Sequence, residues 1–553
     1  NNNTSGAYTV QLKAASGSGA TVTWATTDKG WKFVYFDGVA TNTGVFDINA
    51  DLSINALTIR GNLTVDGGTI KLDGNYPVGT DNVALGNTAL DSVEAGGINN
   101  VAIGDHAGTA ITTGDNNVAV GACTLSSNTT ASNNTAVGIE SLMCNTTGTA
   151  NLALGAYAMC KNTTANNNTA VGAAALLANT TGANNTGVGK DSLIANTTGA
   201  NNVAVGYLSL DANTTGATNV AMGRGSLGAN TTGSCNVAIG DLALVAATTV
   251  SQNTAIGVLS MTATTSGIRN TAVGRQSMCA NTTGCCNVAM GSNALASGTT
   301  GDFNVAVGGA ALGSVNTGNC NTAIGACAMN TNTSGANNTA VGKDSLLANT
   351  TGVNNVAVGK DSLKTNTTAS GNTAVGESAL EVTTTGCCNS ALGNGALQAN
   401  TTGDNNTAVG QAALAFNTTA DNNTAVGRLA MFCNTTGEQN TASGINSLRC
   451  NTTASNNTAV GNAALCLNTT GCENVAMGAK ALDANTTGHY NTAVGYDSLS
   501  SNTTASYNTA VGCNALKVNT TGATNTAVGS TALSANTTGT NNTAVGLSAL
   551  GLN

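Results

Sequence analysis

A repeat of 17 residues runs through most of this chain and constrains its fold more than any other feature. Glycine recurs at 26 successive intervals of 17 residues between Gly104 and Gly546 without one insertion, and an earlier unit ends at Gly86. Each unit reads approximately Gly-x-x-(Ala/Ser)-Leu-x-x-Asn-Thr-Thr-Gly-x-x-Asn-(Thr/Val)-Ala-(Val/Ile), and positions are counted below from its first glycine as position 0. So strict a period predicts a solenoid, because each unit must stack on the one before it.

The coils of this solenoid are predicted to be β. A unit of 17 residues is too short for a helix-turn-helix repeat, and Asn, Thr and Gly fill positions that a helix would give to Ala, Leu, Glu or Lys. We therefore expect an all-β fold, a parallel β-roll or β-helix with 17-residue coils over residues 82–553. With about 4.8 Å between successive coils, this rod would be about 130 Å long.

The short strand in each coil has two different faces. In one such strand, Thr135 and Val137 share a face, and Ala136 and Gly138 share the other. We expect Thr135 and Val137, together with leucines such as Leu142, to form the thin interior. The other face carries only Ala and Gly, so it would permit the backbone of a second chain to come close.

Association of several chains is expected because each coil buries few apolar side chains. The free energy from this burial is small compared with the conformational entropy lost when 17 residues become ordered. The predicted contact between chains lies at Ala136, Ala153 and Ala170 and at the position 0 glycines. Three is the natural number of chains for a fibre, and we therefore predict a homotrimer.

The turn segment Asn-Thr-Thr-Gly ends in a glycine, such as Gly148, that suggests a positive φ. Ala131 and Ala165 occupy the same position in other units, so a positive φ is not obligatory there.

Position 13 is asparagine in every 17-residue unit. Stacked coils would place these side chains about 4.8 Å apart, where each amide can donate to the next. We interpret the column as a structural ladder and not as a ligand site. The predicted ladder includes the asparagines and position 0 glycines of successive coils, among them Asn117, Asn134, Asn151, Gly121, Gly138 and Gly155.

The string Asn-(Thr/Val)-Ala-(Val/Ile)-Gly-x-x-(Ala/Ser), as in residues 100–107, resembles the head repeat of YadA-like trimeric autotransporter adhesins. That resemblance implies a left-handed parallel β-roll in which three chains pack together. The whole 17-residue consensus is similar to repeat arrays in tail fibres and structural proteins of bacteriophages. Over about residues 82–553, it implies a structural or adhesive protein of a virion or cell surface. The implied partners are a host surface glycan or receptor and other virion or filament subunits.

The first residues differ in composition from the repeats. Alternating stretches at 8–12, 21–24 and 31–35 predict strands of a small β domain over residues 1–50. Short strands with glycine turns over residues 51–81 resemble the shaft and adaptor segments of phage fibres, and we expect them to lead into the solenoid.

Catalytic and metal-binding groups are sparse. The only two histidines, His106 and His489, lie far apart in the sequence, and no CxxC has metal spacing. We therefore predict no enzyme activity, no cofactor and no metal site. The net charge of −9 argues against nucleic acid as a partner, and no apolar run is long enough for membrane insertion.

Sixteen cysteines are scattered over the chain, mostly beside the Asn-Thr-Thr turns. Free thiols are the simpler expectation. A disulfide between Cys433 and Cys450 is the alternative, because they share a position in successive coils and their Cα atoms would lie about 4.8 Å apart.

A cluster of aromatic residues near residue 500 is the candidate receptor contact. It consists of His489, Tyr490, Tyr496 and Tyr507, and Tyr490 and Tyr507 share a position, so they should stack on one outer edge. Aromatic faces suit carbohydrate CH groups. The alternative is an exposed tyrosine pair that only packs across neighbouring coils.

Three functions fit these features. The first is a fibre used for host attachment, like a phage tail fibre, and the second is a self-assembling extracellular filament or bacterial surface adhesin. The third is an ice-binding solenoid, but Thr146 and Thr147 are expected to face opposite ways and so cannot form two rows on one flat face. The many Asn-Thr-Thr triplets also match the glycosylation sequon, which we interpret as a coincidence of the repeat.

Overall fold

The computed structural model describes residues 79–314 and 316–551, together with four short strands nearer the amino terminus. The chain divides into two compact units, Asn1–Leu72 and Asp73–Asn553. In the first unit, β1 (Val10–Lys13) pairs antiparallel with β2 (Thr21–Trp24), and β3 (Val34–Phe36) pairs antiparallel with β4 (Val45–Asp47). The expected shaft and adaptor segment lies outside the described residues except for 79–81.

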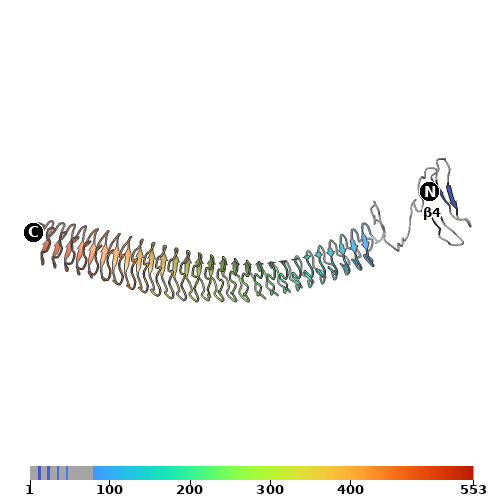
Figure 1. The fold of residues 1–553 in the computed structure, drawn as a ribbon, viewed down its shortest axis with the longest axis horizontal. Coiled ribbons are helices and arrows are strands. Elements are labelled where there is room, and N and C mark those ends of the chain that lie inside the picture. The colour runs from blue at the N-terminus through green and yellow to red at the C-terminus, as the bar shows by residue number, and fades with distance from the viewer. Residues whose placement is uncertain are drawn as a thin grey trace. The chain divides into compact units, whose positions relative to one another are not determined.

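The second unit is a stack of 28 parallel three-residue strands, from β5 (Val83–Leu85) to β32 (Thr543–Val545) (Figure 1). β6 (Val101–Ile103) begins 18 residues after β5, and every later strand begins 17 residues after the one before it and occupies positions 14–16. Each strand pairs in register with its neighbours in the chain, so that strand order follows sequence order. Strand is the only regular element among the described residues, and the predicted all-β parallel solenoid is confirmed.

Each coil turns at residues with a left-handed backbone. Besides the position 0 glycine, residues at positions 2, 4 and 12 have positive φ, as in Glu140 (54°), Leu142 (50°) and Ala150 (57°). Gly148 is not among the positive-φ residues of the described chain, as the alanines at its position indicated. A Cβ built on Gly148 would lie 2.5 Å from Oδ1 of Asn145, but other coils carry Ala131, Ala165 and Val250 at this position, so the turn adjusts to a side chain there.

Position 0 requires glycine for two reasons. Gly138 has a φ of +125°, a conformation that side chains with a Cβ rarely adopt. A Cβ on Gly138 would also lie 2.6 Å from the carbonyl carbon of Gly155 in the next coil, and Gly121 meets Gly138 in the same way at 2.8 Å. These glycines therefore permit close approach between coils of one chain.

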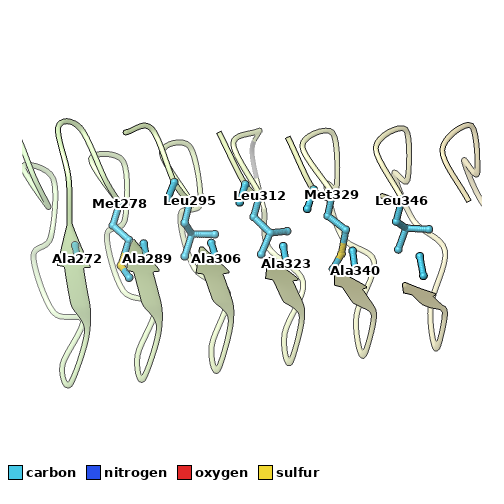
Figure 2. Packing of buried hydrophobic residues seen from close by; sticks show 14 of the residues in the cluster. Ala272, Met278, Ala289, Leu295, Ala306, Leu312, Ala323, Met329, Ala340 and Leu346 are labelled. Atoms are coloured by element: carbon cyan, nitrogen blue, oxygen red, sulfur yellow. The ribbon is translucent and has the colours of Figure 1, made fainter. Parts of the chain in front are cut away.

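The interior of the coil is formed by the opposite strand face from the one expected. Ala136 and Leu142 are fully buried, whereas Val137 points outward and is 37% exposed. Figure 2 shows the same arrangement farther along, where a leucine or methionine at position 4, such as Leu295, packs beside alanines at position 15, such as Ala289. The coil is too thin for branched side chains from both sides, so alanine fits under a single large side chain. The prediction for Leu142 is confirmed, and the prediction for Val137 is wrong.

The predicted contact between chains at Ala136, Ala153 and Ala170 is also wrong. All three alanines have no exposed surface within a single chain, because they face their own coil's interior. No second chain can reach them without opening the solenoid.

Candidate functional site

The side chains at positions 14 and 16 of strands β5–β32 form the outer sheet face of the solenoid. Position 14 holds Thr, Val, Leu or Ser, and position 16 holds Val, Ile, Leu, Met or Ser, so these described strands contribute no charged side chain to the face. Residues of position 16 are substantially exposed, for example Met290 at 45% and Leu392 at 51%. The face is therefore an uncharged, largely aliphatic strip that follows the stack.

The size of the outer sheet face is unusual for a chain that stands alone. The face continues over 28 strands, and its position 16 side chains are half-buried or exposed on every one of them. Monomeric soluble proteins rarely expose contiguous apolar patches of more than a few hundred Å². Such a strip is typical of a surface that another molecule covers.

Charged residues at position 1 border the outer sheet face, one residue past the glycine that follows each strand. Arg224 forms two hydrogen bonds with the carboxylate of Asp241 in the next coil, at 2.8 and 2.9 Å. Lys190 pairs with Asp191 at 3.0 Å and lies 5.5 Å from the ring centroid of Tyr207. These pairs contribute little stability, and they border the apolar centre only in some coils, because Ile139, Val258 and Ile445 are exposed at position 1 of others.

The asparagine ladder at position 13 is present, and its hydrogen bonds are confirmed. Oδ1 of Asn134 accepts from the backbone N–H of Asn151 at 3.0 Å and from its Nδ2 at 3.2 Å. Nδ2 of Asn134 donates to the carbonyl of Gly148 at 2.9 Å and to Oδ1 of Asn117 at 3.3 Å. These amides are buried and their hydrogen-bonding groups are used, so the ladder holds coils together and leaves no group for a ligand.

A second asparagine ladder lies at position 7, within the Asn-Thr-Thr turns, and was not predicted. Nδ2 of Asn162 donates to Oδ1 of Asn145 at 2.8 Å and to the carbonyl of Ala165 at 3.2 Å. The following threonine is half-buried, and Oγ1 of Thr146 donates to the carbonyl of Thr163 at 3.1 Å. Asparagine recurs at position 7 in most units, and this recurrence is the signal in the sequence that could have predicted the second ladder. A turn alone also accounts for an asparagine there.

The asparagines of the glycosylation sequons in these turns are buried in the folded chain. Both hydrogens of Nδ2 of Asn162 are engaged, and Asn162 has no exposed surface. A glycan on that nitrogen would displace the position 7 ladder.

Tyr490 and Tyr507 stack as predicted. Their ring centroids lie 4.9 Å apart with an interplanar angle of 7°, and both side chains are exposed. His489 lies 6.4 Å from Tyr490 at a tilt of 45°, and its Nδ1 accepts from the backbone N–H of Cys472 at 2.9 Å. Glu473 raises the pKa of the Tyr490 hydroxyl.

Carbohydrate binding by these tyrosines would require exposed ring faces, and the stacked pair does not offer both faces of each ring. The faces of Tyr490 and Tyr507 that meet are covered by each other, so a sugar would meet mainly ring edges and hydroxyl groups. Tyr496 is 52% exposed, and within the described chain no ring contact joins it to the pair. Receptor binding by these residues stays a prediction.

Cys433 and Cys450 are free thiols. The backbone N–H of Cys433 donates to the carbonyl of Arg449 at 2.9 Å, which is the parallel pattern that sets Cys450 opposite Cys433. Across the described ranges, no cluster of three or more His, Cys, Asp or Glu side chains is placed to hold a metal ion. The same residues include no helix of the length and apolar character needed to cross a membrane.

The outer sheet face is thus a continuous uncharged surface along the described strands of the solenoid. Comparison of the chain with protein-family models, with curated protein sequences and with solved structures gave no match.

Proposed function

We propose that this protein is a structural fibre subunit whose solenoid associates into a homotrimeric rod used for host attachment, in the manner of a phage tail fibre. The outer sheet face carries the proposal, because an uncharged aliphatic strip that runs the length of a parallel stack needs an equally long cover. A second copy of the same chain supplies one, since its rows repeat with the same spacing between coils. The expected location is a virion or a cell surface.

Three copies are favoured by the shape of the face and by the resemblance to trimeric β-roll adhesins. Each chain offers one flat face, and three flat faces close around an axis with their position 16 side chains at the centre. The position 1 ion pairs, such as Arg224 with Asp241, then contribute polar groups to the rim of each interface in the coils that carry them. This arrangement replaces the predicted contact through the buried alanines.

Sedimentation equilibrium tests the assembly. The wild-type chain is expected to sediment at three times its mass of 53.8 kDa. The double variant Ile256→Lys, Val273→Lys places charges on strands β15 (Thr254–Ile256) and β16 (Thr271–Val273) and is expected to prevent association while its circular dichroism stays that of β structure.

The matched control is Ser266→Lys, Thr283→Lys, which adds the same charges at exposed turn positions of neighbouring coils. This control is expected to remain trimeric. A monomeric wild-type chain, or a trimer that survives lysines on the outer sheet face, would contradict the assembly. Electron microscopy of the wild-type protein separates the fibre from its alternative, because a subunit of a fibre gives rods of fixed length and a self-assembling filament gives indefinite ones.

A further inference from the structure

Cysteines meet across successive coils at one recurring place in the turn before the asparagine of position 7. Cys144 stands at position 6, and Cys160 stands at position 5 of the next coil. The backbone N–H of Cys144 donates to the carbonyl of Cys160 at 3.0 Å. Cys450 and Cys466 repeat this relation, with the corresponding hydrogen bond at 2.9 Å.

The geometry points to two disulfide sites that join neighbouring coils of one chain, Cys144 with Cys160 and Cys450 with Cys466. In this parallel stack the hydrogen bond sets the residue after Cys160, Lys161, opposite Cys144. A coil spacing of about 4.8 Å and a rise of about 3.3 Å per residue therefore put the Cα atoms of Cys144 and Cys160 about 6 Å apart. That separation lies within the range of about 4.4–6.8 Å that a disulfide requires. The inference is independent of the proposed fibre function, because both cysteines of each pair belong to the same chain.

The side chains of the first pair also meet. The Cys144 side chain is close enough to Cys160 to raise the pKa of the Cys160 thiol, and Cys160 is only 8% exposed. Burial, first, and then the neighbouring Cys144 and Glu140 raise the pKa of Cys160 to about 11, while Lys161 acts in the opposite direction. Cys144 is more exposed than Cys160, so it is the thiol that a reagent from solution reaches first.

Formation of the bond requires an oxidant, for which a low-molecular-weight disulfide such as oxidised glutathione suffices. The Cys144 thiolate attacks one sulfur of the reagent, which gives a mixed disulfide and releases one small thiolate. Cys160 loses its proton to solvent and attacks the Cys144 sulfur, and the second small thiolate leaves. Two protein thiols are thereby oxidised to one disulfide, and the reagent is reduced to two thiols.

The elevated pKa of Cys160 makes the second step depend on pH. Below a pKa of about 11, each rise of one pH unit increases its thiolate fraction about tenfold. Closure of the mixed disulfide at Cys144 is therefore expected to be about 100-fold faster at pH 9 than at pH 7.

The experiment is to treat the folded protein with oxidised glutathione, alkylate the remaining thiols in denaturant, digest with chymotrypsin without reduction and identify linked peptides by mass spectrometry. We expect links between Cys144 and Cys160 and between Cys450 and Cys466. Cys433 lies opposite Cys450, so a link between these two is the competing outcome. The exposed Cys235 and Cys320, which lie in separate coils, should be recovered alkylated or as mixed disulfides with glutathione, without a link to another protein cysteine.

Two variants sharpen the result. Cys144→Ser should leave Cys160 fully alkylated. Cys279 stands at position 5 without a cysteine partner, and Ala263 before it donates its backbone N–H to the Cys279 carbonyl at 3.1 Å. Ala263→Cys should therefore create a third linked pair.

Links between Cys433 and Cys450 in place of Cys450 and Cys466 would overturn the assignment, because they would show that a shared position decides the pairing. Complete alkylation of both cysteines in each pair would overturn it as well.

Discussion

Two stretches of the same solenoid differ in one buried column. Over residues 400–536, position 7 is asparagine in every coil, and each Nδ2 donates to the Oδ1 of the preceding one at 2.8–3.2 Å. In the four coils after Asn230 the same position is held by Ala247, Thr264, Asn281 and Gly298, and no bond between position 7 asparagines is formed among these described coils. The column resumes at Asn316, which stands at position 8 of its coil and accepts from Nδ2 of Asn332 at 2.9 Å. The position 13 ladder passes through both stretches without a break.

The interruptions leave buried polar atoms without partners. Asn230 Oδ1 and Thr264 Oγ1 are unpaired at the first interruption. Asn366 Oδ1 and Thr383 Oγ1 are unpaired at a second one. An unsatisfied buried group costs about 1–3 kcal/mol, so the solenoid should be locally weaker at both places.

The comparison teaches that the two asparagine columns have different functions. At position 13, Oδ1 accepts a backbone N–H from the next coil, as Asn474 does from Asn491 at 3.0 Å. At position 7, the side chain bonds only other side chains and the carbonyl of its own turn, as Asn468 does with Asn451 at 3.0 Å and Gly471 at 2.8 Å. Loss of the asparagine at position 7 leaves the backbone N–H groups of the next coil with their partners, so the chain tolerates other residues there.

The largest effect is expected for Asn474→Ala. This change leaves the buried N–H of Asn491 and the carbonyl of Gly488 without the bonds that Asn474 supplies at 3.0 and 2.8 Å. We expect a loss of about 2–4 kcal/mol in the free energy of local opening. Hydrogen exchange of the surrounding coils measures it, and coils far along the stack, which make no contact with the site, are the internal control.

A smaller effect is expected for Asn468→Ala in the same turn region, which imitates the natural alanine Ala247. It removes the bonds to Asn451, Gly471 and Asn485 but leaves every backbone N–H with its partner. The expected loss is about 1–2 kcal/mol by the same exchange measurement. A loss equal to that of Asn474→Ala would refute the distinction between the two columns.

Much of this architecture can be predicted from the sequence, because residues 17 apart occupy the same position in neighbouring coils. This relation alone places Asn134 beside Asn151 and Tyr490 beside Tyr507. The repeat does not predict which strand face points inward, because alternation only assigns Ala136 and Val137 to opposite faces. The width of the coil decides which face is buried. This width depends on how Leu142 fills the interior, and Leu142 has a left-handed backbone conformation that leucine rarely adopts.

Thr383→Asn is expected to strengthen the chain at the second interruption. Asparagine there would connect the run that ends at Asn366 with the run that begins at Asn400 and would supply a donor for the unpaired Asn366 Oδ1. We expect a gain of about 1 kcal/mol in local opening free energy by hydrogen exchange. Thr385→Asn, at the exposed position two residues later, is the control and should change nothing.

The smallest effect is a difference in pH response between the two stretches. Burial, first, and then Asp497 raise the pKa of Asp483, which lies at position 5 within the uninterrupted stretch, while Lys480 acts in the opposite direction. An acid whose folded-state pKa is raised contributes stability below its unfolded pKa of about 3.9 and loses it as the pH rises through the folded value. Acidification from pH 6 to pH 4 should therefore strengthen the coils around Asp483.

The interrupted stretch should respond with the opposite sign. The guanidinium of Arg224 lowers the pKa of Asp241, so the stability that this pair contributes is present at neutral pH and lost as the pH falls through the depressed pKa. Hydrogen exchange at pH 6 and pH 4 measures the gain around Asp483, and a third measurement at about pH 3, below the ordinary pKa of an aspartate, measures the loss around Asp241; all are corrected for intrinsic rates. Asp483→Asn should abolish the gain around its own coil and leave the coils near Asp241 unchanged. If that variant still gained stability on acidification, or if both stretches shifted alike, the response would belong to the net charge of the whole rod and not to these two carboxyl groups.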